Sequence, residues 1–213
     1  MIAPMETKVK QDKPYVLGIT GASAQPIAER TLKLLLENRK SVQLILSKGA
    51  YNVLKSENNI NVPADPETQV KFWRERLRTE KGNLVCHRWN DNSANIASGS
   101  YITEAMLIVP CSMGTVGRIA AGISQNLIER CADVHIKEGR ALIISPRESP
   151  LSLIHLKNLT FLSKAGVKIV PPMPAWYTNP KNIEQMIDFI VVRLLDSLEE
   201  DLDIKLIDRW IGK

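Results

Sequence analysis

The sequence predicts a single domain of the α/β class, built on a doubly wound and predominantly parallel sheet. Short apolar runs alternate with segments whose apolar residues recur at helical spacing, and this alternation is typical of successive βαβ units. Several of the apolar runs end in glycine, small or hydroxyl residues, as strand-to-helix turns often do in such sheets. With 213 residues, of which 44% are hydrophobic and 24% charged, the chain can bury a sizeable core in one domain.

Composition narrows the classes of function. The three cysteines, Cys86, Cys111 and Cys131, are odd in number and far apart, which indicates a reducing compartment and argues against a disulfide framework or a zinc site. The basic residues behind the net charge of +5 are interleaved with acidic ones, so a nucleic-acid interface is not favoured. No apolar stretch reaches membrane-spanning length and residues 1–14 lack a signal-peptide core; we therefore expect a cytoplasmic protein without a membrane partner.

The first predicted unit contains a glycine turn. Residues 1–14 are polar and aperiodic, and we expect a mobile extension there, followed by the domain at 15–213. Residues 15–20 form the first predicted strand, and the turn Gly21-Ala22-Ser23-Ala24-Gln25-Pro26 leads into a helical pattern. Such a turn is a usual place for backbone N–H groups to hold a phosphate or the edge of a cofactor. It is not the Gly-x-Gly-x-x-Gly fingerprint of nicotinamide enzymes.

The next segments give a second hydroxyl turn and an isolated tryptophan. Residues 41–47 are a predicted strand ending in Ser47, which either meets a phosphate or caps the helix expected at 48–57. An exposed helix is expected at 67–80 and a short edge strand at 84–87. Trp89 then enters a loop of small residues, where it is either a packing plug or a stacking surface for a planar ligand.

A third turn of the same kind follows the strand expected at 105–109. There Pro110-Cys111-Ser112-Met113-Gly114-Thr115 opens a helix. Carboxyl ends of parallel strands meet at one edge of a sheet, so three such turns predict a ligand site at that edge. The helix expected at 125–138 carries Arg130 and Lys137 two turns apart, on roughly one face or simply in solvent.

The run 141–155 is the centre of the pattern. A strand ending at Pro146 is followed by Arg147 and Glu148, and Ser149-Pro150 predicts the cap and first residue of a helix at 151–164. An arginine at this turn suits a phosphate and a glutamate suits proton transfer, although a surface ion pair is the simpler explanation of the two alone.

The C-terminal part adds aromatic residues. A last strand is expected at 167–170, and the proline-rich segment 171–177 stiffens the positions of Trp176 and Tyr177. An amphipathic helix is expected at 182–198, bearing Arg193, and Trp210 on a short terminal helix suggests a subunit contact.

Several blocks, taken together and in this order, resemble the flavin prenyltransferases, Rossmann-like flavoproteins paired with the ubiquinone-pathway and aromatic-acid decarboxylases. The resemblance runs from Val16 to about Trp210 and is most specific in the last two blocks. The blocks are Gly21-Ala22-Ser23, Ser47-Lys48, Ala97-Ser98-Gly99-Ser100, Pro110-Cys111-Ser112-Met113-x-Thr115, Ala132-Asp133-Val134 with Lys137-Glu138, Pro146-Arg147-Glu148-x-Pro150-Leu151, and Pro171-Pro172-Met173-Pro174-Ala175-x-Tyr177. Two positions differ from the usual pattern: Ala24 stands in place of a second glycine, and Gly114 stands where many relatives carry lysine.

The resemblance implies an enzyme, a metal-independent transferase that joins a dimethylallyl group from dimethylallyl phosphate to N5 and C6 of reduced FMN. It implies a homo-oligomer, such as a dodecamer, whose product passes to a decarboxylase. The implied FMN-binding residues are Gly21, Ala22, Ser23, Ser47, Ser112, Met113, Gly114, Thr115 and Arg147. The implied phosphate-binding residues are Lys137, Arg147, Tyr177 and Arg193, with Arg130 and Glu57 as additions across a subunit boundary. The implied catalytic residues are Ser23 and Glu148 as proton relays and Trp89 as a π surface.

These types of side chain are suited to the transfer of a dimethylallyl group from its phosphate. An allylic phosphate ionises when charge-assisted donors meet the departing phosphate, and a π face stabilises the allyl cation. The alternatives are a flavin-dependent decarboxylase of the cysteine-peptide type, whose histidine and Pro-Ala-Ser-Ala-Asn-Thr-like block are not evident here, and a non-catalytic FMN carrier subunit.

Overall fold

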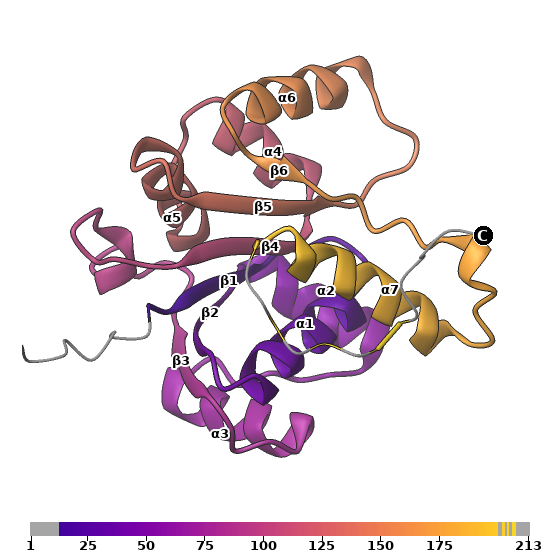
Figure 1. Ribbon diagram of the computed structural model, residues 1–213. Coiled ribbons are helices and arrows are strands. Elements are labelled where there is room, and N and C mark those ends of the chain that lie inside the picture. The colour runs from indigo at the N-terminus through magenta and orange to yellow at the C-terminus, as the bar shows by residue number, and fades with distance from the viewer. Residues whose placement is uncertain (1–12, 200–201, 203, 205, 208–213) are drawn as a thin grey trace, which may run out of the picture.

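The computed structural model describes residues 13–199, 202, 204, 206 and 207. Within them, six strands form one parallel sheet in the order β3-β2-β1-β4-β5-β6 (Figure 1). The strands are β1 Tyr15–Ile19, β2 Ser41–Leu46, β3 Asn83–His87, β4 Ala105–Cys111, β5 Ala141–Pro146 and β6 Lys168–Ile169. The helices are α1 Gln25–Glu37, α2 Lys48–Asn58, α3 Pro66–Leu77, α4 Met113–Ala120, α5 Leu127–Lys137, α6 Leu153–Lys164 and α7 Ile183–Asp196, with short 3₁₀ turns η1 Asn95–Ala97 and η2 Trp176–Thr178. This architecture confirms the predicted doubly wound α/β domain.

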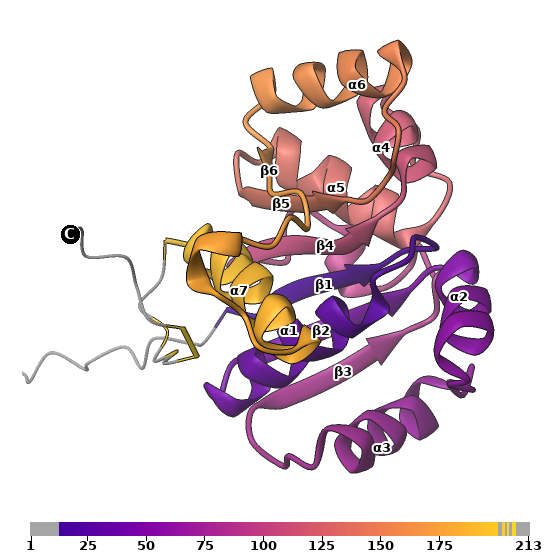
Figure 2. The same cartoon turned by 90° about the vertical axis from the view of Figure 1, so that its right-hand side faces the viewer.

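Helices cover both faces of the sheet, as Figures 1 and 2 show. Because successive side chains of a strand point to opposite faces, Leu17 and Ile19 of β1 join a core with α1, α2, α3 and α7, whereas Val16 joins a second core with α4, α5 and part of α6. The central strands are buried on both sides, which explains why they read as continuous apolar runs.

The strand order reverses between β1 and β4. The chain passes from β1 through β2 to β3 on one side, and from β4 through β5 to β6 on the other. Helix α1 covers one face of the sheet and α4 covers the opposite face, so the switch point lies between the carboxyl ends of β1 and β4, and we call the surface there the crevice. Such a switch point is where open α/β sheets bind ligands.

Some predicted boundaries were wrong. Helix α6 begins at Leu153, because Ser152 caps it reciprocally with His155, each backbone N–H donating to the other side chain; Ser149 and Pro150 stay outside the helix. The helix expected to be exposed at 67–80 ends at Leu77 and buries Trp73 in the core. The apolar residues of this buried face are interspersed with charged residues in the sequence, which is why an exposed helix was predicted there.

Four other predictions differ less from the structure or lie outside the described residues. The helix predicted at 125–138 spans Leu127–Lys137, with Asn126 as its cap, and the last strand spans only Lys168–Ile169. Residues 1–12, most of the predicted extension, and Trp210 are not among the described residues. In the described ranges, no helix has the length and apolar character needed to cross a bilayer.

Candidate functional site

Hydrogen bonds join four strand-to-helix turns at the carboxyl edge of the sheet. The N–H and the hydroxyl of Thr20, a fully buried residue, both donate to the Pro110 carbonyl, at 3.2 and 2.8 Å, and the hydroxyl accepts from the Ser112 N–H at 2.8 Å. The Ser47 N–H donates to the Ile19 carbonyl, and the Arg147 N–H donates to the Cys111 carbonyl. The turns after β1, β2, β4 and β5 therefore form one surface, as their sequences predicted.

Two glycines let the first two turns touch. A Cβ atom on Gly21 would lie 2.9 Å from the Cα of Gly49, too close for any side chain. Ser47 caps α2, its hydroxyl accepting from the Ala50 N–H at 3.1 Å, so the capping role left open by the sequence is confirmed. The two turns consequently present a smooth backbone wall to the crevice.

Ser23 and Glu57 meet within one chain. The Ser23 hydroxyl donates to Glu57 Oε2 at 2.8 Å, and Glu57 lies in the last turn of α2. Within this chain α2 brings Glu57 to the turn that carries Ser23, and the role of Glu57 across a subunit boundary stays a prediction. The pair gives a hydroxyl and a carboxylate positioned to exchange a proton with a group beside them.

The third turn is arranged around the start of α4. Ser112 caps this helix, accepting from the Thr115 N–H at 3.3 Å, and the two hydroxyl oxygens are 3.0 Å apart. Met113 and Thr115 are buried, whereas Gly114 is exposed at the helix N-terminus. Arg118 approaches this turn, with one guanidinium nitrogen 3.4 Å from the Thr115 hydroxyl, and its Nε donates to the buried Glu129.

Arg147 and Glu148 stand at the end of β5, and both are partly exposed. Glu148 Oε1 accepts from the Ser149 N–H at 3.1 Å and lies 4.0 Å from a guanidinium nitrogen of Arg147. This weak, exposed ion pair leaves both side chains able to engage a ligand.

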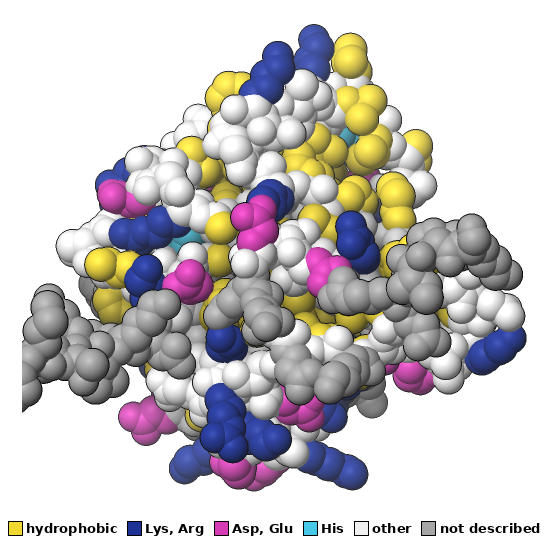
Figure 3. Space-filling model, viewed as in Figure 1, with side chains coloured by type: hydrophobic (Ala, Val, Ile, Leu, Met, Phe, Trp, Pro, Cys, Tyr) yellow, Lys and Arg dark blue, Asp and Glu magenta, His cyan; other side chains and the backbone are white. Residues whose placement is uncertain are grey.

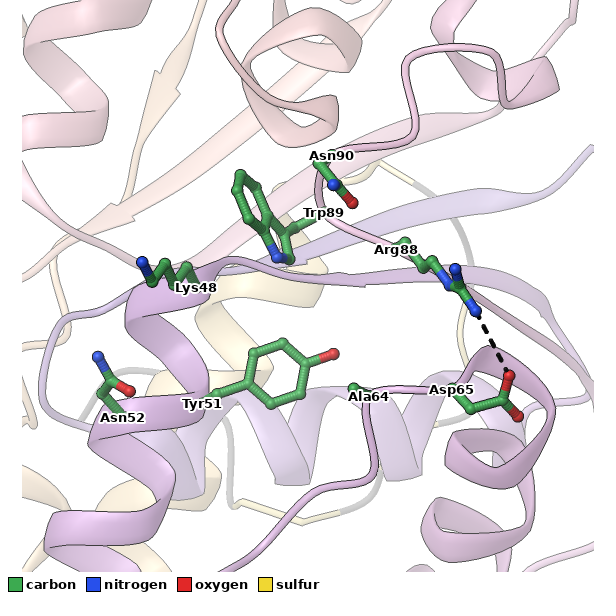
Figure 4. A pocket seen from close by; sticks show the side chains of 8 residues that line it. All are labelled: Lys48, Tyr51, Asn52, Ala64, Asp65, Arg88, Trp89 and Asn90. Atoms are coloured by element: carbon green, nitrogen blue, oxygen red, sulfur yellow. Dashed lines mark ion pairs between the residues drawn. The ribbon is translucent and has the colours of Figure 1, made fainter.

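Trp89 borders a pocket of about 560 Å³ beside the crevice (Figure 4). In the pocket Trp89 lies across from Tyr51, and Arg88 pairs with Asp65 at 3.8 Å. The indole is partly buried against the second core, while the Trp89 carbonyl accepts from the Leu127 N–H at 2.8 Å. The side chain therefore packs as a plug and also presents surface to a pocket, so both of the proposed roles are compatible with its position.

Tyr177 and Arg193 lie on neighbouring elements. Tyr177 belongs to η2, and its ring makes an edge-to-face contact with Phe189 of α7, with 6.1 Å between centroids. Arg193 follows Phe189 by four residues, which places it on the same side of α7. It is exposed and lies 3.3 Å from Asp196. The structure thus gives these two predicted residues a common surface.

Lys137 does not lie near Arg147 within one chain. Helix α5 ends at Lys137, with three residues between it and the start of β5 at Ala141, whereas Arg147 follows the other end of that strand. A helix that returns the chain to a parallel strand ends at the sheet's amino edge, so Lys137 and Arg147 are at opposite edges. Lys137 lies 3.7 Å from Glu138, beside Gly99. Within one chain these two predicted phosphate-binding residues are therefore apart, and their joint binding of the phosphate stays a prediction.

The side chain of Arg130 is likewise bonded to residues other than those around Arg147. Its Nε donates to the Ala97 carbonyl at 3.0 Å and another guanidinium nitrogen pairs with Asp133 at 2.8 Å. Both contacts hold its side chain on the surface formed by α5 and the loop around Ser98.

The histidines and cysteines have structural surroundings. Burial lowers the pKa of His135 to about 4, and its ring is bonded to the Cys131 carbonyl and the Thr103 hydroxyl. Burial raises the pKa of Cys86 and Cys131 to about 12, so both thiols stay protonated. Within the described part of the chain, no three His, Cys, Asp or Glu side chains gather as metal ligands.

Two residues that shape the crevice, Thr20 and Gln25, were not predicted from the sequence. Thr20 was assigned only to a strand, and Gln25 only to a turn. A polar residue at the end of an otherwise apolar strand was the available signal for Thr20. For Gln25 the sequence offered none, because its partners are backbone carbonyls.

Comparisons with known proteins agree with this geometry. The chain matches the Flavoprotein family model over residues 4–195. It is 49% identical over 201 residues to the flavin prenyltransferase UbiX of Synechocystis sp., covering 94% of this chain and 97% of that protein. It is 39% identical over 194 residues to the flavin prenyltransferase UbiX of Pseudomonas aeruginosa, covering 91% and 92% of the two chains.

One solved structure with a similar fold is that of AnUbiX in complex with FMN and dimethylallyl pyrophosphate, with a TM-score of 0.83 and 33% identity, covering 95% of this chain and all of that one (100%). A dodecameric FMN-dependent UbiX-like decarboxylase from Escherichia coli has a TM-score of 0.81 and 35% identity, covering 93% and 100% of the two chains. The family match spans most of the chain, and the relatives match it almost end to end. This chain therefore belongs to the Flavoprotein family and, within it, to the flavin prenyltransferases.

Proposed function

We propose that the protein transfers a dimethylallyl group from dimethylallyl phosphate to N5 and C6 of reduced FMN. The observation that carries this proposal is the single surface made by four turns at the switch point. It combines the Ser23–Glu57 pair with Arg147 and Glu148. Family membership supports the same activity, since flavin prenyltransferases match the chain over more than nine-tenths of its length.

The residues at the crevice fit FMN. The wall where Gly21 meets Gly49 admits a flat group against the backbone. Beside it, the exposed N-terminus of α4 and the guanidinium of Arg147 are suited to a phosphate. The Ser47 and Ser112 hydroxyls, both partly exposed, can bond to polar atoms of the same molecule. When bound, reduced FMN supplies the electron-rich ring atoms to which the prenyl group is joined.

The side chains of the chain supply the remaining chemistry. Arginine and lysine donors bind the departing phosphate and lower the cost of breaking its allylic C–O bond. Trp89 gives a π face near the allylic cation. Ser23, backed by Glu57, and Glu148 on the far side of the switch point hold or accept protons released at the acceptor.

We further propose that a second copy completes the phosphate site. Lys137 is at the opposite edge of the sheet from Arg147, and the Arg130 guanidinium is bonded to Ala97 and Asp133, so we assign both residues to the crevice of a neighbouring copy. Exposed apolar side chains over α6 support such an assembly: Leu153, Ile154 and Phe161 have exposed fractions of 66%, 70% and 58%. Hydrophobic side chains gather in that region of the surface (Figure 3), as expected for a protein–protein contact.

We also propose that the modified flavin passes to a decarboxylase and that the protein acts in the cytoplasm. The three free and buried cysteines are consistent with a reducing compartment.

Product analysis tests the proposal. The purified protein is incubated anaerobically with reduced FMN and dimethylallyl phosphate, and the released flavin is analysed by mass and absorption spectrum. We expect a flavin that is heavier by one prenyl group. Unmodified FMN would indicate a carrier, and loss of CO₂ from an added aromatic or peptidyl acid would indicate a decarboxylase; either result would overturn the proposed transfer.

A further inference from the structure

The turn that carries Ser23 contains a strained residue. Ala24 has φ 82° and ψ 32°, in the left-handed region that glycine adopts freely and alanine does not. Helix α1 starts directly after it without a side-chain cap, although Ser, Thr, Asp or Asn is usual at that position. The conformation of this turn must therefore be held by contacts from elsewhere.

Gln25 provides those contacts. Its side chain is 2% exposed, and its Nε2 donates to the Thr20 carbonyl at 2.9 Å and to the Ala22 carbonyl at 2.7 Å. Both hydrogens of one amide group are used on the two peptide groups that flank Gly21 and Ser23. Because a buried side chain with two such bonds has little freedom, Gln25 fixes the orientation of both peptide planes.

Fixing these carbonyls also fixes two N–H groups. In a trans peptide the C=O and N–H bonds point in opposite directions, and neither of these peptide bonds is cis. With the carbonyls of Thr20 and Ala22 turned inward to Gln25, the N–H groups of Gly21 and Ser23 face the side on which Gly21 is exposed. In the backbone hydrogen bonds of the described residues, neither N–H is a donor.

We propose that Gln25 is a positioning residue that aims the Gly21 and Ser23 N–H groups and the Ser23 hydroxyl at the bound flavin. The hydrogen bonds of Gln25 thereby stabilise a left-handed conformation at Ala24 that glycine would adopt freely. The inference rests on FMN binding as proposed above. It implies that Gln25, although it does not contact the ligand, contributes measurably to the affinity for flavin.

The test is the dissociation constant for FMN, measured by calorimetry on the full chain. Gln25→Met keeps the length and burial of the side chain but removes both donors. We expect about tenfold weaker FMN binding, the effect of one or two lost hydrogen bonds, with an unchanged Michaelis constant for dimethylallyl phosphate. Adding Ala24→Gly to Gln25→Met should recover part of the affinity, because the turn then needs less support.

Gln25→Glu gives a second and more specific readout. A carboxylate cannot donate to the two carbonyls, whereas a protonated carboxyl can donate to one. FMN affinity of this variant should therefore increase as the pH falls and the introduced buried carboxyl takes up a proton, relative to wild type at each pH. A general loss of packing would produce no such pH dependence.

Thr31→Val is the matched control. Thr31 is fully buried on the same helix, and its hydroxyl donates to the Ile27 carbonyl at 2.7 Å, away from the turn. Its replacement should lower thermal stability and leave FMN affinity unchanged. FMN binding by Gln25→Met and Gln25→Glu within twofold of wild type at every pH would overturn the inference, and Gln25→Glu alone decides if the methionine variant does not fold. Absence of prenylated product from wild type would refute only the proposed reaction, since FMN affinity is measured separately.

Discussion

At the scale of single residues, two carboxylates approach the crevice from opposite sides of the switch point. Glu57 is bonded to Ser23 at 2.8 Å, so its charge is directed to one hydroxyl. Among the described residues, Glu148 accepts a hydrogen bond from the neighbouring Ser149 N–H and has a loose contact with Arg147. The second carboxylate is consequently the one with more freedom to take a proton from a ligand.

This difference predicts the effect of Glu148→Gln. The amide keeps the shape of the side chain but cannot accept a proton, so we expect FMN affinity close to wild type and turnover lower by about a hundredfold or more. Rapid mixing of the reduced complex with dimethylallyl phosphate measures the step directly. Arg140→Lys is a suitable control, since Arg140 bonds to the Tyr101 carbonyl at the opposite edge of the sheet. Wild-type rates in Glu148→Gln would show that Glu148 only shapes the turn.

At the scale of elements, the proline-rich segment 171–177, which runs into η2, and helix α7 act as a pair. The edge-to-face contact between Tyr177 and Phe189 connects them. Two large side chains of the segment, Met173 and Trp176, are 69% and 73% exposed. The segment is therefore packed against α7 at Tyr177 and exposed at Met173 and Trp176.

This arrangement predicts separate effects on substrate and flavin. Arg193→Ala should raise the Michaelis constant for dimethylallyl phosphate about ten- to a hundredfold, because a hydrogen bond to a charged group contributes about 1.5–3 kcal/mol. Tyr177→Phe should cost less, since the ring still packs on Phe189. FMN dissociation constants should stay near wild type for both variants. Steady-state kinetics and calorimetry provide the two readouts, and loss of flavin affinity without a change in the substrate constant would place these residues in the FMN site.

At the scale of the whole molecule, the parallel sheet separates two sets of basic residues. Strand β5 and its flanking helix put Lys137 at one edge and Arg147 at the other. No side-chain rotation can close that separation, because a six-residue strand spans about 20 Å. A phosphate site using both residues requires two copies of the chain.

Subunit complementation tests this arrangement. Lys137→Ala and Glu148→Gln are each expected to be inactive, whereas co-expressed chains should recover about a quarter of wild-type activity, because random assembly leaves that share of shared sites intact. Each variant co-expressed with wild type serves as control, and light scattering measures the oligomer. A mixture no more active than its separate components would place Lys137 and Glu148 in the same chain's site or outside it.

The sequence by itself determined the sheet, its parallel direction and the three small-residue turns that the structure brings together. These features depend on local signals: apolar runs of strand length, helical spacing, and glycine or hydroxyl residues where a strand meets a helix. The blocks from Gly21 to Tyr177 were also sufficient to indicate the family, because motif order is a property of sequence alone.

Only the tertiary structure decided which side chains meet. Ser23 and Glu57 are 34 positions apart, and no periodicity relates them. Lys137 and Arg147 are only ten positions apart in the sequence, yet a strand separates them. The support of the glycine turn by Gln25 was likewise hidden, because its partners are backbone carbonyls common to every residue. Local patterns specify elements, whereas contacts depend on how the packed sheet orders those elements in space, and the site is made of such contacts.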